Sequence, residues 1–186
     1  MRNIFDRYKK KFGVNCKVCL FLLIANGALI TSTSGQEVWS DKTRVLPNKL
    51  RKVRTILTLS HLPNPDHPEE AEEESKWKYI WKHSTTICSP YEDLEVIEAG
   101  SFIWYTSDGW KENVQLSRRE FIKRFECPKG LLKKGHCYTY EKNYRFGNTL
   151  YGGDALWYVL AKDANGELVK GFGIIETEKE LKDDKF

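Results

Sequence analysis

The stretch "LEVIEAGSFIWY" (residues 94–105) decides the fold, because it is apolar on both faces of a strand. Side chains of a strand alternate between its two faces, and both sets here are mainly apolar beyond Val96. A strand of this kind is buried on both sides, so we expect it to lie in the centre of a sheet. Strand-like runs on either side of it are separated by turn signals, as in an antiparallel β domain.

Glu98 stands out within this stretch, because the alternation places it on the same face as Val96. A carboxylate on that face destabilises the fold unless it is paired, hydrogen-bonded or protonated. Three outcomes are open. Glu98 is a structural acid satisfied by Arg145, a Tyr hydroxyl or His83; it lines a cleft with a raised pKa and takes part in binding or catalysis; or a bulge at Ala99–Gly100 turns it to solvent.

The neighbouring segments predict the rest of the fold. A capping box, Ser117 with Glu120, begins a short helix over residues 117–125, and "DANG" (163–166) predicts a hairpin. The other expected strands cover residues 54–60, 76–87, 111–116, 137–146, 154–163 and 168–178. The sequence therefore predicts a mainly β protein, an antiparallel β-sandwich or a curved barrel-like sheet with one short helix. An α+β curved sheet that wraps a helix is the alternative.

Residues 1–35 have the pattern of an export signal, a basic segment followed by the apolar run "VCLFLLIANGALI" and small residues. An uncleaved N-terminal anchor is the alternative, and it is the one route by which we expect contact with a membrane. A basic lead-in and an acidic, proline-rich linker follow over 36–75, then a β-rich domain over 76–181 and a charged tail over 182–186.

Charge excludes one class of function. The net charge of +4 includes about +5 from residues 1–35, so the rest of the chain is near −1. The basic character belongs to the targeting segment, and we expect no nucleic-acid partner. The acidic segment 61–75 is expected to be a mobile, solubilising loop, with electrostatic docking onto the basic lead-in as the alternative.

Cysteine usage follows from export. In an oxidising compartment the three cysteines beyond the signal can pair. We expect a disulfide between Cys127 and Cys137, which enclose a short loop with Pro and Gly, and a buried free thiol at Cys88; a bridge from Cys88 to either of the others is the alternative. The histidines at 61 and 67 lie in the segment expected to be mobile, so we expect no metal site.

Aromatic residues are the strongest candidate for function. In "KWKYIWKH" (76–83), alternation puts Trp77, Tyr79, Trp81 and His83 on one face and lysines on the other, as in a half-buried strand. We expect that face to line a core or a cleft, with His83 at the cleft's mouth or as a histidine hydrogen-bonded to backbone. The candidate ligand-binding residues are Trp81, His83, Glu98, Trp104, Tyr140 and Arg145.

No nucleophile elbow, Walker loop, zinc-protease motif or dinucleotide fingerprint occurs in the chain. We therefore expect a secreted or periplasmic binding module without catalysis or cofactor, which uses an aromatic-lined cleft or patch for a glycan or a protein partner. The alternative is a secreted hydrolase with a carboxylate pair in an aromatic groove.

Overall fold

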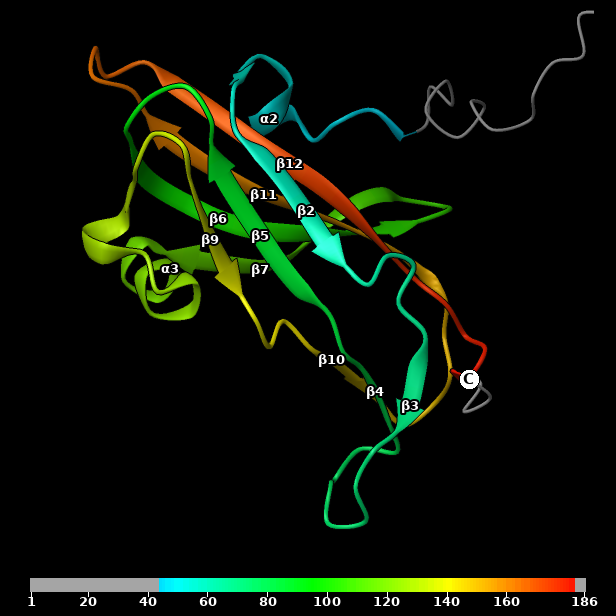
Figure 1. Ribbon diagram of the computed structural model, residues 1–186. Coiled ribbons are helices and arrows are strands. Elements are labelled where there is room, and N and C mark those ends of the chain that lie inside the picture. The colour runs from blue at the N-terminus through cyan, green and yellow to red at the C-terminus, as the bar shows by residue number, and fades with distance from the viewer. Residues whose placement is uncertain (1–43, 183–186) are drawn as a thin grey trace, which may run out of the picture. The chain divides into compact units, whose positions relative to one another are not determined.

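The structure is a computed structural model that describes residues 44–182 (Figure 1). The predicted signal peptide, the first part of the lead-in and the end of the charged tail lie outside the described residues. In chain order the elements are α2 (Asn48–Arg51), β1 (Arg54–Thr55), β2 (Thr58–Leu62), β3 (Pro68–Glu70), β4 (Tyr79–Trp81), β5 (Ser84–Ser89), β6 (Leu94–Tyr105), β7 (Gly109–Ser117), α3 (Arg118–Phe125), the 3-10 turn η3 (Pro128–Gly130), β8 (Leu131–Leu132), β9 (His136–Tyr140), β10 (Arg145–Gly147), β11 (Gly153–Lys162) and β12 (Leu168–Thr177).

Six of these strands form one large sheet. Its order is β1-β12-β11-β6-β7, with β8 paired to the start of β6, and every pair except β1 with β12 is antiparallel. β6 lies between β11 and β7, as its two apolar faces predict. Figure 1 shows the sheet curling into half a barrel. The predicted class, a mainly β protein with a curved barrel-like sheet and one short helix, is confirmed.

A bulge in β6 changes which residues share a face. Ile97 has no partner on β11, because the register between the two strands shifts at this point. Val96 packs into the main core, whereas Glu98 lies on the opposite face with Phe102. The prediction that Glu98 shares a face with Val96 is wrong, since the extra residue of a bulge reverses the alternation. The shift lies just before the predicted position, Ala99–Gly100.

A second sheet, in the order β2-β5-β9, covers one face of the large sheet (Figure 1). Two glycines of β12 permit the close approach of the chain around β2. A Cβ atom at Gly171 would lie 2.6 Å from the Cβ of Leu57, and one at Gly173 would lie 2.6 Å from the backbone oxygen of Leu59. Such distances are too short for real side chains, so the two layers pack here backbone against backbone.

The main core fills the space between these two sheets, and α3 covers one end of it. The predicted capping box is present, with the Ser117 hydroxyl and the Glu120 carboxylate each bonded to the other residue's backbone N–H. Phe121 and Phe125 stack on each other with ring centroids 4.4 Å apart and are fully buried. A smaller apolar cluster on the other face of the large sheet includes Leu50 of α2.

The third sheet, in the order β10-β4-β3, continues the strands of the second, because β2 leads into β3, β4 into β5 and β9 into β10. We call β3, β4 and β10, together with the loop 71–78, the arm. Figure 1 shows the arm extending away from the two packed sheets, which we call the body, with the loop at its far end. Each covering strand is thus interrupted once, at the junction between the body and the arm.

Segment 61–75 is structured where a mobile loop was expected. It contributes the end of β2 and all of β3, and His61, Asp66 and Pro68 are buried. The strand expected over 76–87 is shorter and is interrupted between β4 and β5. The predicted alternation of burial is nevertheless present, with Trp81 in β4 and His83 in the gap both buried and the lysines exposed.

The disulfide joins Cys88 to Cys137, and the predicted bridge between Cys127 and Cys137 is wrong. Cys88 and Cys137 face each other across β5 and β9 with their Cα atoms 4.1 Å apart. Cys127 is free and lies in the main core, where burial raises the pKa of its thiol to about 11. A short loop made the other bridge possible, but the pairing of distant strands determined which thiols meet.

Candidate functional site

The six residues predicted to bind a ligand are not gathered in one place. Trp81 and Arg145 are direct neighbours, paired across β4 and β10 at the base of the arm. The other four lie in the junction between arm and body, on the large sheet and beside α3: His83, Glu98, Trp104 and Tyr140.

Glu98 belongs to a cluster on the outer face of the large sheet, beneath α2. Its carboxylate accepts a hydrogen bond from the Nζ of Lys49 at 2.5 Å and another from the hydroxyl of Tyr158. The same ammonium donates to the Tyr158 oxygen at 2.9 Å and lies 3.3 Å from the carboxylate of Glu112. The side chains of Glu98 and Lys49 are 24% and 27% exposed, so water reaches the pair only in part.

The electrostatics of this cluster favour a charged Glu98. Burial alone raises the pKa of the Glu98 carboxyl, but the hydrogen bonds from Lys49 and Tyr158 outweigh it and hold the pKa below its usual value. Burial and the bond to Glu98 raise the pKa of Tyr158 to about 12. A carboxyl that acts as a general acid needs a raised pKa, which Glu98 does not have. The Lys49 ammonium forms ion pairs with both nearby carboxylates, Glu98 and Glu112. The cluster can hold α2 on the sheet, with the Lys49 ammonium between the two acids.

Trp81 and Arg145 tie the base of the arm to its surroundings. The Trp81 ring is fully buried, stacks on Tyr151 with centroids 4.3 Å apart and donates its Nε1–H to the Glu178 carbonyl at 2.8 Å. The Arg145 guanidinium lies 5.2 Å from the Tyr151 ring centroid and donates to the Thr177 hydroxyl at 2.9 Å. All of these groups are engaged within the chain.

His83 lies in a buried polar cluster at the junction rather than at the mouth of a cleft. Its Nδ1–H donates to the Asp66 carboxylate at 2.8 Å. Its ring meets that of His61 edge to face, with centroids 5.9 Å apart. The Nδ1 atom of His61 lies 2.9 Å from the Thr85 hydroxyl oxygen, which also accepts a hydrogen bond from the Asn143 amide at 2.7 Å.

Trp104 and Tyr140 each carry a basic side chain over one ring face. The Arg44 guanidinium lies 5.3 Å from the Trp104 ring centroid, and the Trp110 ring meets Trp104 edge to face. The Arg124 guanidinium lies 5.4 Å from the Tyr140 ring centroid and donates to its hydroxyl at 3.2 Å. These contacts are typical cation–π pairs, and they cover the flat surfaces on which a sugar ring would stack.

The arm carries open hollows that the sequence analysis did not identify. Three shallow pockets, each lined in part by Glu70, open on it, and one has a volume of about 210 Å³. Their apolar lining includes Ile80 and Phe146 in one and Trp77 and Tyr79 in another, and Phe146 is 45% exposed. The sequence feature that marks these hollows is the acidic segment 61–75 next to the aromatic alternation of 76–83, but its prolines and like charges predict a mobile loop.

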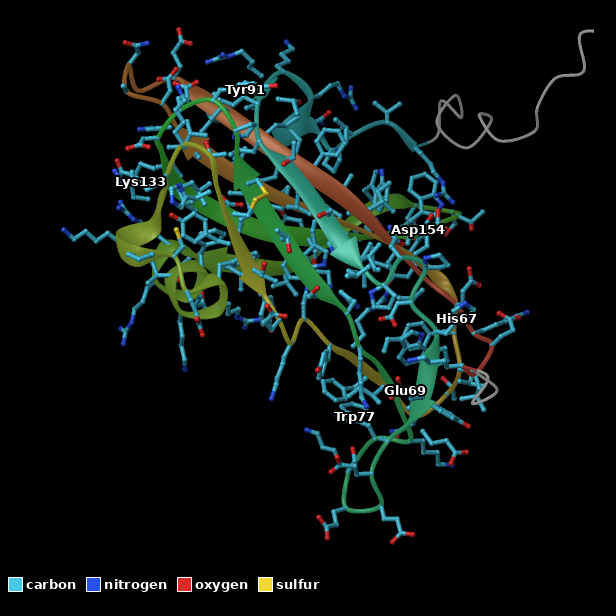
Figure 2. The ribbon with its side chains drawn as sticks, in the orientation of Figure 1. His67, Glu69, Trp77, Tyr91, Lys133 and Asp154 are labelled. Carbon is cyan, nitrogen blue, oxygen red and sulfur yellow. A yellow bond between two sulfur atoms is a disulfide. The ribbon has the colours of Figure 1, made fainter. Side chains whose placement is uncertain are left out.

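The carboxylates of the arm are mostly unneutralised. Glu69 accepts bonds from the ammonium groups of Lys82 at 2.6 Å and Lys182 at 3.2 Å, and these bonds lower the pKa of Glu69. Four further acids form no ion pair with any residue of the described part of the chain: Glu70, Glu72, Glu73 and Glu74. Figure 2 shows Glu69 and Trp77 on the arm, at the opposite end of the molecule from Tyr91 and Lys133.

The alternative in which the acidic segment docks onto the basic lead-in is wrong for the described part of the lead-in. Basic residues there pair with acids of the large sheet and of the β11–β12 hairpin instead. The pairs are Arg44 with Asp154, Lys49 with Glu98 and Arg54 with Asp163. The lead-in is thus attached to the body, and the arm keeps its negative charge.

Within residues 44–182, no group of three His, Cys, Asp or Glu side chains is placed to hold a metal ion. Over the same residues, no helix combines the length and apolar character that a membrane crossing requires.

Comparisons with known proteins give no family and several distant structural resemblances, of which two are described here. No family model matches the chain, and no curated protein is similar to it. The X-ray structure of a Northeast Structural Genomics Consortium target, SoR45, is 10% identical over 70% of this chain and 90% of its own, with a TM-score of 0.46. The crystal structure of the putative ApaA protein from Bordetella pertussis is 17% identical over 67% of this chain and 97% of its own, with a TM-score of 0.45.

Proposed function

We propose that this protein is an exported, non-catalytic binding module that holds a protein partner on its arm. The observation that carries the proposal is the set of hollows on the arm, where half-exposed aromatic side chains lie beside unpaired carboxylates. Aromatic residues anchor protein interfaces because they bury a large area with few rotatable bonds. The acids around them favour a partner surface that combines apolar and basic side chains.

The state of the aromatic rings favours a protein over a glycan. Sugar binding of the kind expected from the sequence needs open, flat ring faces. On the arm, the Lys76 ammonium lies 5.2 Å from the Trp77 ring centroid, and Arg145 covers Tyr151 in the same way. Trp104 and Tyr140, away from the arm, are also covered by arginines. A protein side chain can use the edges and gaps that remain, as in the pocket beside Phe146.

Export to a secreted or periplasmic location is part of the proposal. It is supported by the signal-like pattern of residues 1–35 and by the disulfide, since disulfides persist mainly in oxidising compartments. The alternative function, a hydrolase that uses a carboxylate pair, has no comparable support, because the pKa of Glu98 is lowered by its bonds to Lys49 and Tyr158.

The experiment is an affinity capture from the organism's own extracytoplasmic fraction, using the full-length chain and three variants. Trp77→Ala and Phe146→Ala each remove an aromatic group from the arm. Tyr91→Ala removes an aromatic ring, 71% exposed, at the other end of the molecule. We expect the same partner to be captured by the wild type and by Tyr91→Ala, and at least tenfold less, about 1.4 kcal/mol, by either arm variant.

Two outcomes would contradict the proposal. Equal capture by all variants means that the partner binds elsewhere on the body. The same proteins are also screened against immobilised glycans, the other class of ligand expected from the sequence. A glycan that binds the wild type but not Trp77→Ala would show that the arm binds a glycan and not a protein. All three side chains are at least partly exposed, so unchanged melting temperatures exclude unfolding as the cause.

A further inference from the structure

The arm is attached to the body through a small buried cluster of polar groups. The chain passes from body to arm between β2 and β3, between β4 and β5, and between β9 and β10. Asp66, His83 and Asn143 lie in these three passages, one in each, and all three are buried. Figure 1 shows these passages together between the covering sheet and the arm.

Hydrogen bonds in this cluster connect the three passages to each other and to β12. The backbone N–H of Asn143 donates to the His83 carbonyl at 3.1 Å, and the His83 ring donates to Asp66 at 2.8 Å. Asp66 in turn is held by backbone bonds to Glu176 and Glu178, at 2.8 and 2.9 Å. These bonds attach the base of the arm to the body at one buried place.

His61, at the end of β2, is the sensitive member of the cluster. It is 8% exposed, and its Nε2 atom has no hydrogen-bond partner among the described residues. With the Asn143 amide donating to the Thr85 oxygen, the Thr85 hydroxyl proton can be donated to Nδ1 of His61. That arrangement suits a neutral imidazole. A second proton on the ring would bring a positive charge into the buried cluster. It would also occupy Nδ1, so that the Thr85 hydroxyl could no longer donate its hydrogen bond to this atom.

The charged groups around His61 do not offset such a proton. The one carboxylate in the cluster, Asp66, is already bonded to His83, whose ring lies edge to face with that of His61. From β10, the Arg145 guanidinium reaches Thr177 and adds a further positive charge on this side. From β5 and the β9–β10 passage come only the neutral Thr85 and Asn143. From β12 the Gly173 backbone favours the proton, but its effect is smaller: burial, followed by the neighbouring His83, lowers the pKa of His61 to about 4.

We propose that the cluster of His61, His83 and Asp66 is an acid-sensitive latch, which holds the arm to the body at neutral pH and releases it in mildly acidic surroundings. Release separates the three passages while the two packed sheets stay folded, because no buried residue of the main core belongs to a passage. This proposal rests on the proposed function only in taking the arm to be the binding element, so a bound partner would be released by acid.

The size of the effect follows from proton linkage. His83 and Asn143 pack around His61 and its partner Thr85, and both lie in the passages that separate on release, so release uncovers the His61 ring although β2 stays in the body. In water the ring has an ordinary pKa of 6.5, whereas burial holds its pKa at about 4 in the closed state. The released state therefore binds more protons, and acid favours it. Between pH 7.5 and pH 5 the equilibrium moves toward release by about 30-fold from this residue alone.

Hydrogen exchange on the full-length chain, without any partner, measures this release. Rates at pH 7.5 and pH 5 are corrected for intrinsic exchange. Protection of the arm, and of the Asn143 amide in the passage that leads into it, is compared with that of β11 in the body. We expect arm protection to fall by about 30-fold at pH 5 while β11 keeps its protection. In His61→Asn, which cannot titrate, the fall should be less than about threefold.

His67→Asn is the matched control, because His67 lies in the same segment (Figure 2) but is only partly buried. It should behave as the wild type does. Constant arm protection in the wild type overturns the latch, as does a fall of equal size in His61→Asn. If His61→Asn does not fold, the pKa of His61 is measured in the wild type from the NMR signal of its imidazole. A pKa near 6.5 instead of near 4 would overturn the latch as well. Neither result depends on whether the arm binds a partner.

Discussion

Replacing Glu98 with Gln tests the register of β6 and the role of the cluster beneath α2. The variant removes the charge that holds the Lys49 ammonium and weakens the bond from Tyr158. Hydrogen bonds to charged groups contribute about 1.5–3 kcal/mol when partly buried. The exposure of the two charged side chains, 24% and 27%, leaves some screening by solvent, so we expect a loss of about 2 kcal/mol.

Glu95→Gln is the matched control on the same strand. Glu95 also carries an ion pair, with Arg118, but the two side chains are 50% and 42% exposed, and surface pairs of this kind contribute about 0–1 kcal/mol. With a urea m-value of about 2 kcal/mol/M, the midpoint should fall by about 1 M for Glu98→Gln and by at most about 0.5 M for Glu95→Gln.

The pH dependence gives the same comparison an internal check. Burial raises the pKa of Glu98, but the stronger effect of Lys49 and Tyr158 lowers it below 4.5. A lowered folded-state pKa means that the carboxylate stabilises the fold above pH 4.5 and that this contribution disappears as the pH falls through the folded-state value. The difference between wild type and Glu98→Gln should therefore shrink at pH 3. Equal urea midpoints for the two variants at pH 7 would refute both the register and the ion pair.

Three further results are expected. Peptide mapping without reduction should link Cys88 to Cys137, and a peptide that joins Cys127 to either would contradict the strand pairing. Cys127 should resist alkylation in the native protein at pH 8 and react once urea unfolds it, because burial raises its pKa to about 11; rapid native labelling would show that the thiol is accessible. Gly171→Ala should lower the free energy of unfolding by about 1–3 kcal/mol, since its Cβ would overlap Leu57, and an unchanged urea midpoint would contradict this packing.

Local patterns in the sequence predicted the elements that depend on local physics. The central place of β6 follows from its two apolar faces, the start of α3 from Ser117 and Glu120, and the last hairpin from the turn at Asn165–Gly166. These signals work because the residues that determine each element lie next to each other in the chain.

The remaining features depend on partners that are distant in sequence. Ile97 bulges because of the register with β11, which the alternation of β6 cannot reveal. His61 and Asp66 are buried in a proline-rich segment because β12, about 110 residues further on, binds that segment. The disulfide partner of Cys137 was misassigned for the same reason, since strand pairing rather than loop length brings the thiols together.

The continuity of the strands through the junction determines how a pull on the arm would be carried. Each strand of the arm is joined by backbone to one strand of the covering sheet, so tension applied at the tip runs along the strand axes and loads their hydrogen bonds in shear. β5 and β9 cannot slide freely past each other under such a load, because the Cys88–Cys137 bridge links them covalently at the end of the covering sheet that lies away from the junction. A force on the arm would therefore extend the junction before it disrupted the body. Reduction of the disulfide would remove the covalent link that keeps β5 and β9 in register under that force.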